Sequence, residues 1–332
     1  MLPDWLNHRA ALTPERLALV TSGARWTFRE LNERVSGAAV WLQTLGVQSG
    51  ERVAVLARNS ANYVVLVHAI SRAGAVLVPL NTRLTPAELA WQINHLSVKL
   101  LLTDDAHTQT ADALAQPTPL RVESLSQDFT HHVSRFTFHA TSFSLDSIHS
   151  ILFTSGTTGQ PKGAQLTFGN HWWSAVGSAL NLGLHADDVW LACLPLFHVG
   201  GLSILLRGVI YGIPVVVHES FDAVAVNAAI AAERVTIISV VSAMLQRMLE
   251  VGFGAQPTSL RCILLGGGPA PRPLLEACAE RGLPVVQTYG LTEAASQVAT
   301  LAPEDALRKL GSAGKPLMPT ELKIENPDAN GV

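Results

Sequence analysis

Short apolar runs alternate with amphipathic stretches along most of this 332-residue chain, and this alternation restricts the fold more than any other feature. Val53 to Leu56 and Ala75 to Pro79 are typical of buried strands, and Ala61 to Arg72 between them is typical of a helix. Strands connected by helices form βαβ units, in which the two strands lie parallel in one sheet. We therefore predict an α/β fold.

The same alternation continues beyond residue 80. Thr85 followed by Pro86 is typical of a helix N-terminus, and we expect this helix to reach His95. A strand should follow at Lys99 to Thr103, and a short edge strand at Leu120 to Glu123.

Two distant segments share one order of elements. Residues 51–80 and 188–217 each contain a charged residue, a strand, a helix, a glycine and a second strand. The likeness indicates either an internal duplication or only the common pattern of βαβ units, and the sequence favours neither. We place two similar βαβ-type subdomains at about residues 1–147 and 148–332.

The composition fits a globular protein and limits its partners. Apolar residues make up 48% of the chain and charged residues 15%, which predicts a large buried core and excludes a disordered protein. The net charge of −3 and the lack of a basic block give no indication of a nucleic-acid partner. Charged residues, Gly or Pro interrupt the most apolar stretches, so we expect no membrane span. Three isolated cysteines (Cys193, Cys262 and Cys278) fit a cytoplasmic location.

The loop after the predicted strand Ser150 to Thr154 suits a triphosphate. In order it contains Ser155, Gly156, Thr157, Thr158, Gly159, Gln160, Pro161, Lys162 and Gly163. The glycines allow tight turns that direct backbone N–H groups into a concavity for anionic oxygens. The hydroxyl groups, including that of Thr154, add hydrogen-bond donors, and Lys162 adds a positive charge. The sequence therefore predicts a phosphate-binding loop rather than an ordinary surface turn.

This loop differs from the Walker loop, in which Gly-Lys is followed by Ser or Thr at the start of a helix. Here Pro161 precedes Lys162 and Gly163 follows it, and Ala164 to Phe168 is typical of a strand. We expect a hairpin-type phosphate loop between two strands, which disfavours a Walker-type NTPase.

The loop resembles the signature of the adenylate-forming superfamily of acyl-CoA synthetases, luciferases and peptide-synthetase adenylation domains. Residues 194–201 resemble the histidine-bearing segment of that superfamily, and residues 287–293 its adenine- and metal-binding segment. Residues 263–271 and 309–316 most resemble the o-succinylbenzoate–CoA ligases of menaquinone biosynthesis. The resemblance implies the large N-terminal core of the adenylate-forming fold.

This resemblance implies an activity, cofactors and partners. An aromatic acid, o-succinylbenzoate, would be activated by ATP with Mg²⁺ to an acyl-adenylate and then transferred to coenzyme A. The alternatives are another acyl- or aryl-CoA ligase, or a catalytically incomplete nucleotide-binding fragment. The resemblance also suggests a homodimer.

The resemblance also implies roles for individual residues. The β- and γ-phosphates would be held by Thr154, Ser155, Gly156, Thr157, Thr158, Gly159 and Lys162. The adenine would lie against Gly267, Gly268, Thr288, Tyr289 and Gly290. Thr292 would contact the α-phosphate and Glu293 would bind Mg²⁺, so that Lys162, His198, Thr292 and Glu293 form the catalytic set.

Four residues are candidates for binding the acid. His198 would line the acyl pocket by resemblance, and Ser242 and Gln297 are candidates for the pocket wall. Arg207 is the only charged residue between Leu202 and Val217. It would either face solvent or bind a second carboxylate of the substrate in an apolar pocket, and we favour the second.

The family pattern continues beyond the last residue of this chain. We expect that a strand begins at Thr320 to Ile324 and that the small C-terminal domain of the family is absent. The chain alone should then bind ATP weakly and turn over poorly.

Overall fold

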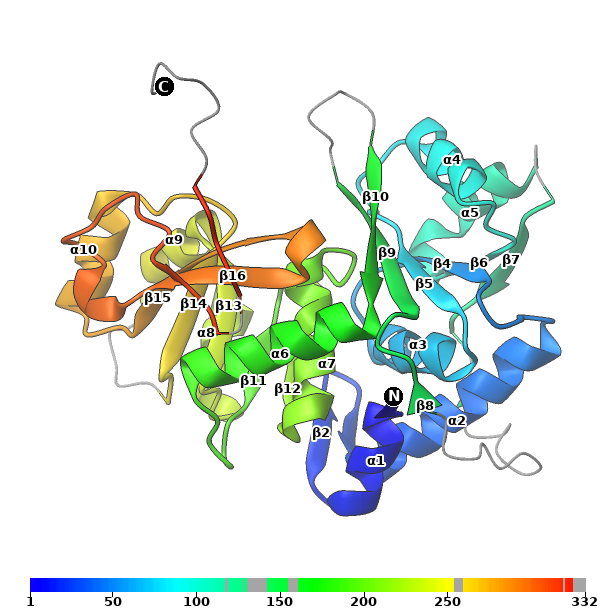
Figure 1. Cartoon of the computed structure of the whole chain (residues 1–332), viewed down its shortest axis with the longest axis horizontal. Helices are drawn as coiled ribbons and strands as arrows, with labels where there is room; N and C mark the ends of the chain where they lie inside the picture. Colours follow the sequence, from blue (N-terminus) through cyan, green and yellow to red (C-terminus); the bar gives the residue numbers. More distant parts are fainter. Residues whose placement is uncertain are drawn as a thin grey trace.

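The structure is a computed structural model that describes residues 1–116, 119–126, 128–129, 142–154, 161–253, 259–318 and 320–324. Within these residues it contains two large sheets flanked by helices (Figure 1). The six-stranded sheet has the order β10 (Lys162–Thr167), β9 (Ile148–Thr154), β5 (Val76–Pro79), β4 (Arg52–Leu56), β6 (Leu100–Thr103) and β7 (Arg121–Ser124). The nine-stranded sheet has the order β17 (Lys315–Pro316), β16 (Ser296–Leu301), β15 (Val285–Leu291), β14 (Cys262–Gly266), β13 (Ile237–Val241), β11 (Trp190–Ala192), β12 (Val215–Val217), β2 (Leu17–Val20) and β3 (Arg25–Thr27). A third sheet pairs β1 (Leu2–Pro3) with β8 (Ser142–Phe143).

Ten α-helices cover the sheets in the described part of the chain. They are α1 (Trp5–Leu12), α2 (Phe28–Thr44), α3 (Ala61–Arg72), α4 (Pro86–His95), α5 (Thr108–Ala115), α6 (Phe168–Leu182), α7 (Val199–Tyr211), α8 (Ala223–Ala232), α9 (Ser242–Glu250) and α10 (Arg272–Glu280). The predicted bounds of α3 and α4 are confirmed. Helix α4 begins with a capping box, in which Thr85 and Glu88 satisfy backbone N–H groups at the helix start.

The predicted βαβ units are both present. Strands β4 and β5 lie parallel on either side of the α3 connection, with Arg52 opposite Val76. Strands β11 and β12 are connected by α7 in the same way, with Trp190 opposite Val215. The α/β prediction is therefore confirmed, and β7 is the edge strand expected near residue 120.

The sheets do not divide the chain between residues 147 and 148, where we placed the subdomain boundary. Strand β9 lies next to β5 in the first sheet, with Ser150 opposite Leu77, and β10 folds back on β9. Strand β2, from the N-terminal region, instead joins the second sheet beside β12, with Leu19 opposite Val215. An apolar strand is stabilised by any sheet edge that is free to pair with it, and local sequence does not specify which edge that is.

The strand expected at Thr320 to Ile324 is wrong. These residues have no regular secondary structure, and Ile324 is 92% exposed. A strand needs a neighbour for its backbone hydrogen bonds, and no described strand pairs with this segment.

One hydrophobic core connects the two sheets through the helices between them. It includes Val53 and Leu77 from the six-stranded sheet and Trp190 and Val215 from the nine-stranded sheet. Two further cores lie on the other sheet faces, under α8 to α10 and under α4 and α5. All three cysteines are free and buried. None of the helices in the described ranges is both long and apolar enough to span a bilayer.

Candidate functional site

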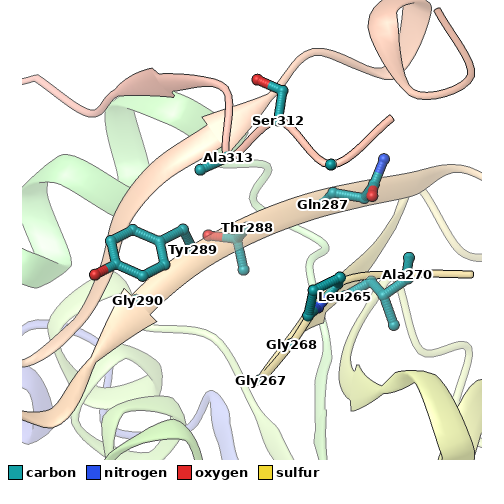
Figure 2. A pocket seen from close by; sticks show the side chains of 12 residues that line it. Leu265, Gly267, Gly268, Ala270, Gln287, Thr288, Tyr289, Gly290, Ser312 and Ala313 are labelled. Carbon is teal, nitrogen blue, oxygen red and sulfur yellow. The ribbon is translucent and has the colours of Figure 1, made fainter. Parts of the chain in front are cut away.

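The first cavity of the site lies where β14 and β15 end, and it has a volume of about 370 Å³ (Figure 2). It is lined by Leu265, Gly267, Gly268, Pro269, Ala270, Gln287, Thr288, Tyr289, Gly290, Gly311, Ser312 and Ala313. All five residues that we predicted for the adenine are among them. The carboxyl ends of parallel strands meet at one sheet edge, which is where open α/β sheets bind ligands.

Two of these glycines are required by the backbone. Gly267 has a φ of +81°, in the region that favours glycine. A Cβ on Gly290 would lie 2.0 Å from the carbonyl oxygen of Ser296, because β15 bulges against β16 at this point. The turn therefore presents bare backbone beside the half-exposed ring of Tyr289, which suits a flat aromatic base.

A second cavity of about 430 Å³ adjoins the first and shares Gly267, Thr288 and Gly290 with it. It is lined by Leu194, Pro195, His198, Val199, Gly200, Arg207, Ser239, Val240, Val241, Leu264, Gly266, Gly267, Thr288, Gly290, Leu291, Thr292, Ser296 and Gln297. The structure thus gathers His198, Arg207, Thr292 and Gln297 from two distant parts of the sequence around one space.

The predicted phosphate loop is described only at its two ends. Residues 155–160, with the predicted phosphate ligands Ser155, Gly156, Thr157, Thr158 and Gly159, lie outside the described residues. Its ends form the expected hairpin, in which Thr154 of β9 lies opposite Lys162 of β10. The edge strand β10 is on the side of its sheet that faces the nine-stranded sheet (Figure 1).

The base of this hairpin lies beside the predicted metal ligand. The Thr154 hydroxyl donates a hydrogen bond to Oε1 of Glu293 at 3.4 Å, although the two residues are 139 positions apart. The Glu293 carboxylate is exposed at the end of β15, and hard oxygen donors of this kind suit Mg²⁺. No group of three or more metal-ligating side chains occurs in the described ranges. By its chemistry the Glu293 carboxylate could supply one oxygen ligand to Mg²⁺, with phosphate oxygens and water as the others.

Arg207 is a buried cation without an anionic partner among the described residues. Its side chain lies on α7 with the residue 2% exposed, over the Trp190 ring at 5.7 Å. Its Nη2 donates to the Ser174 hydroxyl at 3.1 Å, whereas its Nε has no hydrogen-bond partner. No Asp or Glu of the described chain forms an ion pair with it, and burial lowers its pKa below the usual value. The solvent-facing alternative for Arg207 is therefore wrong.

His198 precedes α7 and lines the second cavity. Its ring lies against Phe197, with the ring centroids 4.6 Å apart, and it does not cap the helix through its side chain. Desolvation at the cavity and the nearby Arg83 lower the pKa of His198. The imidazole is consequently neutral at pH 7 and can exchange hydrogen bonds with a carboxylate without adding a charge.

Two further predicted wall residues have different positions. Gln297 is 5% exposed and lines the cavity, where its Nε2 donates to the Thr288 hydroxyl at 3.3 Å and its Oε1 has no partner. Ser242 begins α9 but is not among the residues that line either cavity. Its neighbour Val241, the last residue of β13, lines the second cavity instead.

The sequence did not indicate two residues that hold the site together. Asn59 donates from Nδ2 to the carbonyls of Leu194 and His218, both at 3.0 Å, and its Oδ1 accepts the N–H of Leu196 at 2.9 Å. It thereby ties the His198 loop to the six-stranded sheet. The other is Ser174 on α6, which contacts Arg207. Both act over more than 30 positions in sequence, and no local pattern signals such contacts.

The fold contains two large sheets, with a glycine-lined cavity at the ends of β14 and β15. The β9–β10 hairpin lies beside the Glu293 carboxylate. Together these features define a nucleotide-binding α/β enzyme core. The profile of the family described as AMP-binding enzyme matches residues 6–332. The chain belongs to this family, and the predicted superfamily is confirmed.

Two named relatives in this family are similar to almost the whole chain. The chain is 49% identical over 325 residues to a 2-succinylbenzoate–CoA ligase of Geobacillus sp. (strain WCH70), covering 98% of this chain and 65% of that protein. A 2-succinylbenzoate–CoA ligase of Bacillus cereus is also 49% identical over 325 residues and is covered to 66%. The chain therefore spans about two thirds of the length of these relatives.

Solved structures show the same likeness. O-succinylbenzoate coenzyme A synthetase of Bacillus subtilis, in complex with ATP and magnesium ion, has a TM-score of 0.91 and 44% identity, over 98% of this chain and 67% of that one. The N-terminal domain of a Mycobacterium tuberculosis protein, FACL13, has a TM-score of 0.88 and 31% identity, over 96% of this chain and 83% of that one. The fold is thus that of the large domain of adenylate-forming enzymes.

Proposed function

We propose that this chain is the nucleotide- and acid-binding core of an AMP-forming acid–CoA ligase that activates 2-succinylbenzoate in menaquinone biosynthesis. The observation that carries the proposal is Arg207, a buried guanidinium on the wall of the second cavity that has no anionic partner in the part of the chain that the structure describes. The similarity to 2-succinylbenzoate–CoA ligases supports it.

In this proposal the parts of such a reaction occupy the two cavities. The adenine lies in the first cavity between Tyr289 and the Gly267 backbone, and the acid lies in the second. The phosphates extend toward the β9–β10 hairpin, where Lys162 supplies positive charge and Glu293 holds Mg²⁺. When bound, Mg²⁺ neutralises phosphate charge. A carboxylate is already ionised at pH 7, so the protein mainly orients it toward the α-phosphate, with Thr292 and His198 on either side.

Arg207 distinguishes among possible acids. 2-Succinylbenzoate carries two carboxylates, and only one is activated. The other would accept charge-assisted hydrogen bonds from Arg207, including one from the unpartnered Nε. A fatty acid or a simple benzoic acid would leave this buried cation unpaired, which is costly. The structure therefore favours a diacid over the acids of other acyl- and aryl-CoA ligases.

The binding of two acids tests this proposal. 2-Succinylbenzoate is compared with 3-benzoylpropionate, the same molecule without the ring carboxylate, by calorimetric titration of the wild type and Arg207→Leu. We expect the diacid to bind the wild type at least about 10-fold more tightly, since one charged hydrogen bond contributes about 1.5–3 kcal/mol. Arg207→Leu should remove that preference.

Arg234→Leu is a control, because this arginine lies outside both cavities. An equal affinity of the wild type for the two acids would contradict the proposed substrate.

The remaining expectations belong to the same proposal. Coenzyme A would be the second substrate and would receive the acyl group from the adenylate. A cytoplasmic location and a homodimer stay predictions. Size-exclusion chromatography with light scattering would give the oligomeric state.

A further inference from the structure

The hydroxyl of Ser174 connects the acid cavity to the turn that carries the metal ligand. It accepts a hydrogen bond from Nη2 of Arg207 at 3.1 Å and donates one to the carbonyl oxygen of Ala295 at 2.6 Å. A guanidinium can only donate, a carbonyl can only accept, and a hydroxyl has one proton. The direction of both bonds is therefore fixed, from Arg207 through Ser174 to Ala295.

The backbone at the end of this chain of bonds is strained. Ala295 has a φ of +53° and Ser296 a φ of +107°, in the region that residues other than glycine rarely adopt. Such conformations persist only where surrounding contacts hold them, and they cluster at functional sites. The Ser174 bond is one of those contacts, and Ala295 itself is 1% exposed.

The strained residues determine where the predicted nucleotide and metal ligands lie. The Ala295 N–H donates to the Thr292 carbonyl at 2.9 Å and closes the short 3-10 turn Thr292–Ala294. Glu293 is inside this turn and accepts the hydrogen bond from Thr154. A shift of the Ala295 carbonyl would consequently move Thr292 and Glu293 relative to the phosphate hairpin.

We propose that Ser174 is a positioning residue that couples acid binding at Arg207 to the placement of Thr292 and Glu293, and this rests on the proposed function. A carboxylate that binds Arg207 holds the guanidinium in one orientation. The fixed guanidinium keeps the Ser174 hydroxyl directed at Ala295, and hydrogen bonds in such a chain strengthen one another. The occupied acid cavity thereby favours the turn geometry that binds nucleotide and Mg²⁺.

Ligand coupling provides the test, because a merely structural serine would not affect it. The affinity for the α,β-methylene analogue of ATP with Mg²⁺ is measured by calorimetry with and without saturating 2-succinylbenzoate. This analogue cannot be cleaved at the bond that adenylation breaks, so only binding is observed. In the wild type we expect the acid to tighten nucleotide binding at least about 5-fold.

Variants of Ser174 and one control variant separate the hydroxyl from other effects. Ser174→Ala should bind both ligands but lose the coupling, and Ser174→Thr, which keeps the hydroxyl, should retain it. If Ser174→Ala does not fold, Ser174→Cys replaces it, since a thiol is a weak donor. Ser178→Ala is the matched control, because Ser178 is buried on the same helix and has no hydrogen bond to Arg207 or to residues 292–297. This control should keep the coupling.

The outcomes distinguish the two proposals. Coupling that persists in Ser174→Ala or Ser174→Cys overturns the role of Ser174 and leaves the proposed function intact. If the two ligands bind the wild type independently, this result likewise overturns the role of Ser174 and leaves the proposed function intact. A wild type that does not bind 2-succinylbenzoate overturns the proposed function and this inference with it.

Discussion

Three buried histidines beneath the phosphate hairpin predict that the protein loses stability in mild acid. His68 lies on α3, His149 on β9 and His171 on α6, and each is 7% exposed or less. His149 and His171 are 4.7 Å apart between ring centroids, and His171 shares a 3.0 Å hydrogen bond with Ser150. Burial lowers the pKa of His68 to about 4 and that of His171 to about 3, and lowers that of His149 well below its ordinary value.

The sign and size of the effect follow from these pKa values. Each histidine stays neutral in the folded protein but gains a proton in the unfolded chain below pH 6.5. The unfolded state therefore binds more protons, and stability falls as pH drops from about 6.5 toward 4. At pH 5, which is 1.5 units below the unfolded pKa, each histidine costs about 2 kcal/mol. We choose His68, whose charged neighbours are Asp4 and Arg72, for the test.

Urea unfolding followed by tryptophan fluorescence at pH 8, 7, 6 and 5 measures this loss. The free energy of unfolding of His68→Gln should fall about 2 kcal/mol less between pH 7 and 5 than that of the wild type. Between pH 8 and 7 the two proteins should show parallel curves, which serves as the internal control. Equal losses between pH 7 and 5 would refute the reasoning, because they would mean that His68 titrates alike in both states.

Three further predictions concern single residues. Gly290→Ala should destabilise the protein by about 1–3 kcal/mol in a thermal melt and weaken AMP binding, because its Cβ would meet the Ser296 carbonyl; an unchanged melt would contradict the bulge. Glu293→Gln should abolish the increase in ATP affinity that Mg²⁺ causes and leave Mg²⁺-free binding intact, as titration with and without EDTA would show. Arg261→Leu should cost about 3 kcal/mol in urea unfolding, since it leaves the buried Asp188 carboxylate without its bidentate partner; a loss below about 1 kcal/mol would mean that water replaces the pair.

Local patterns in the sequence predicted much of the fold. The bounds of α3 and α4 followed from periodicity and from the Thr85–Pro86 start, because these signals lie within the helix itself. The pairing of β2 with β12 could not be predicted, since it joins residues almost 200 positions apart. The strand at Thr320 to Ile324 was wrong for a related reason: its apolar residues have no partner strand in the described structure.

The parts of the site whose residues are close together in sequence could be predicted. The turn at Gly267 and the segment from Tyr289 to Thr292 line the cavities, and each could be found because its glycines and polar residues are close together in sequence. From the sequence, the apolar residues around Arg207 could only favour its burial. The structure shows that Arg207 is buried. Asn59 and Ser174 could not be found, since each becomes important only through contacts that the fold creates.

The account's central claim is that the two adjoining cavities form one site for an adenylate of a diacid. The most direct measurement is the affinity for a non-hydrolysable 2-succinylbenzoyl-adenylate mimic, in which an acyl sulfamate replaces the acyl phosphate. Because this ligand fills both cavities at once, we expect it to bind at least about 100-fold more tightly than AMP or 2-succinylbenzoate alone. Arg207→Leu should remove most of that gain. A mimic that binds no more tightly than AMP would contradict the claim.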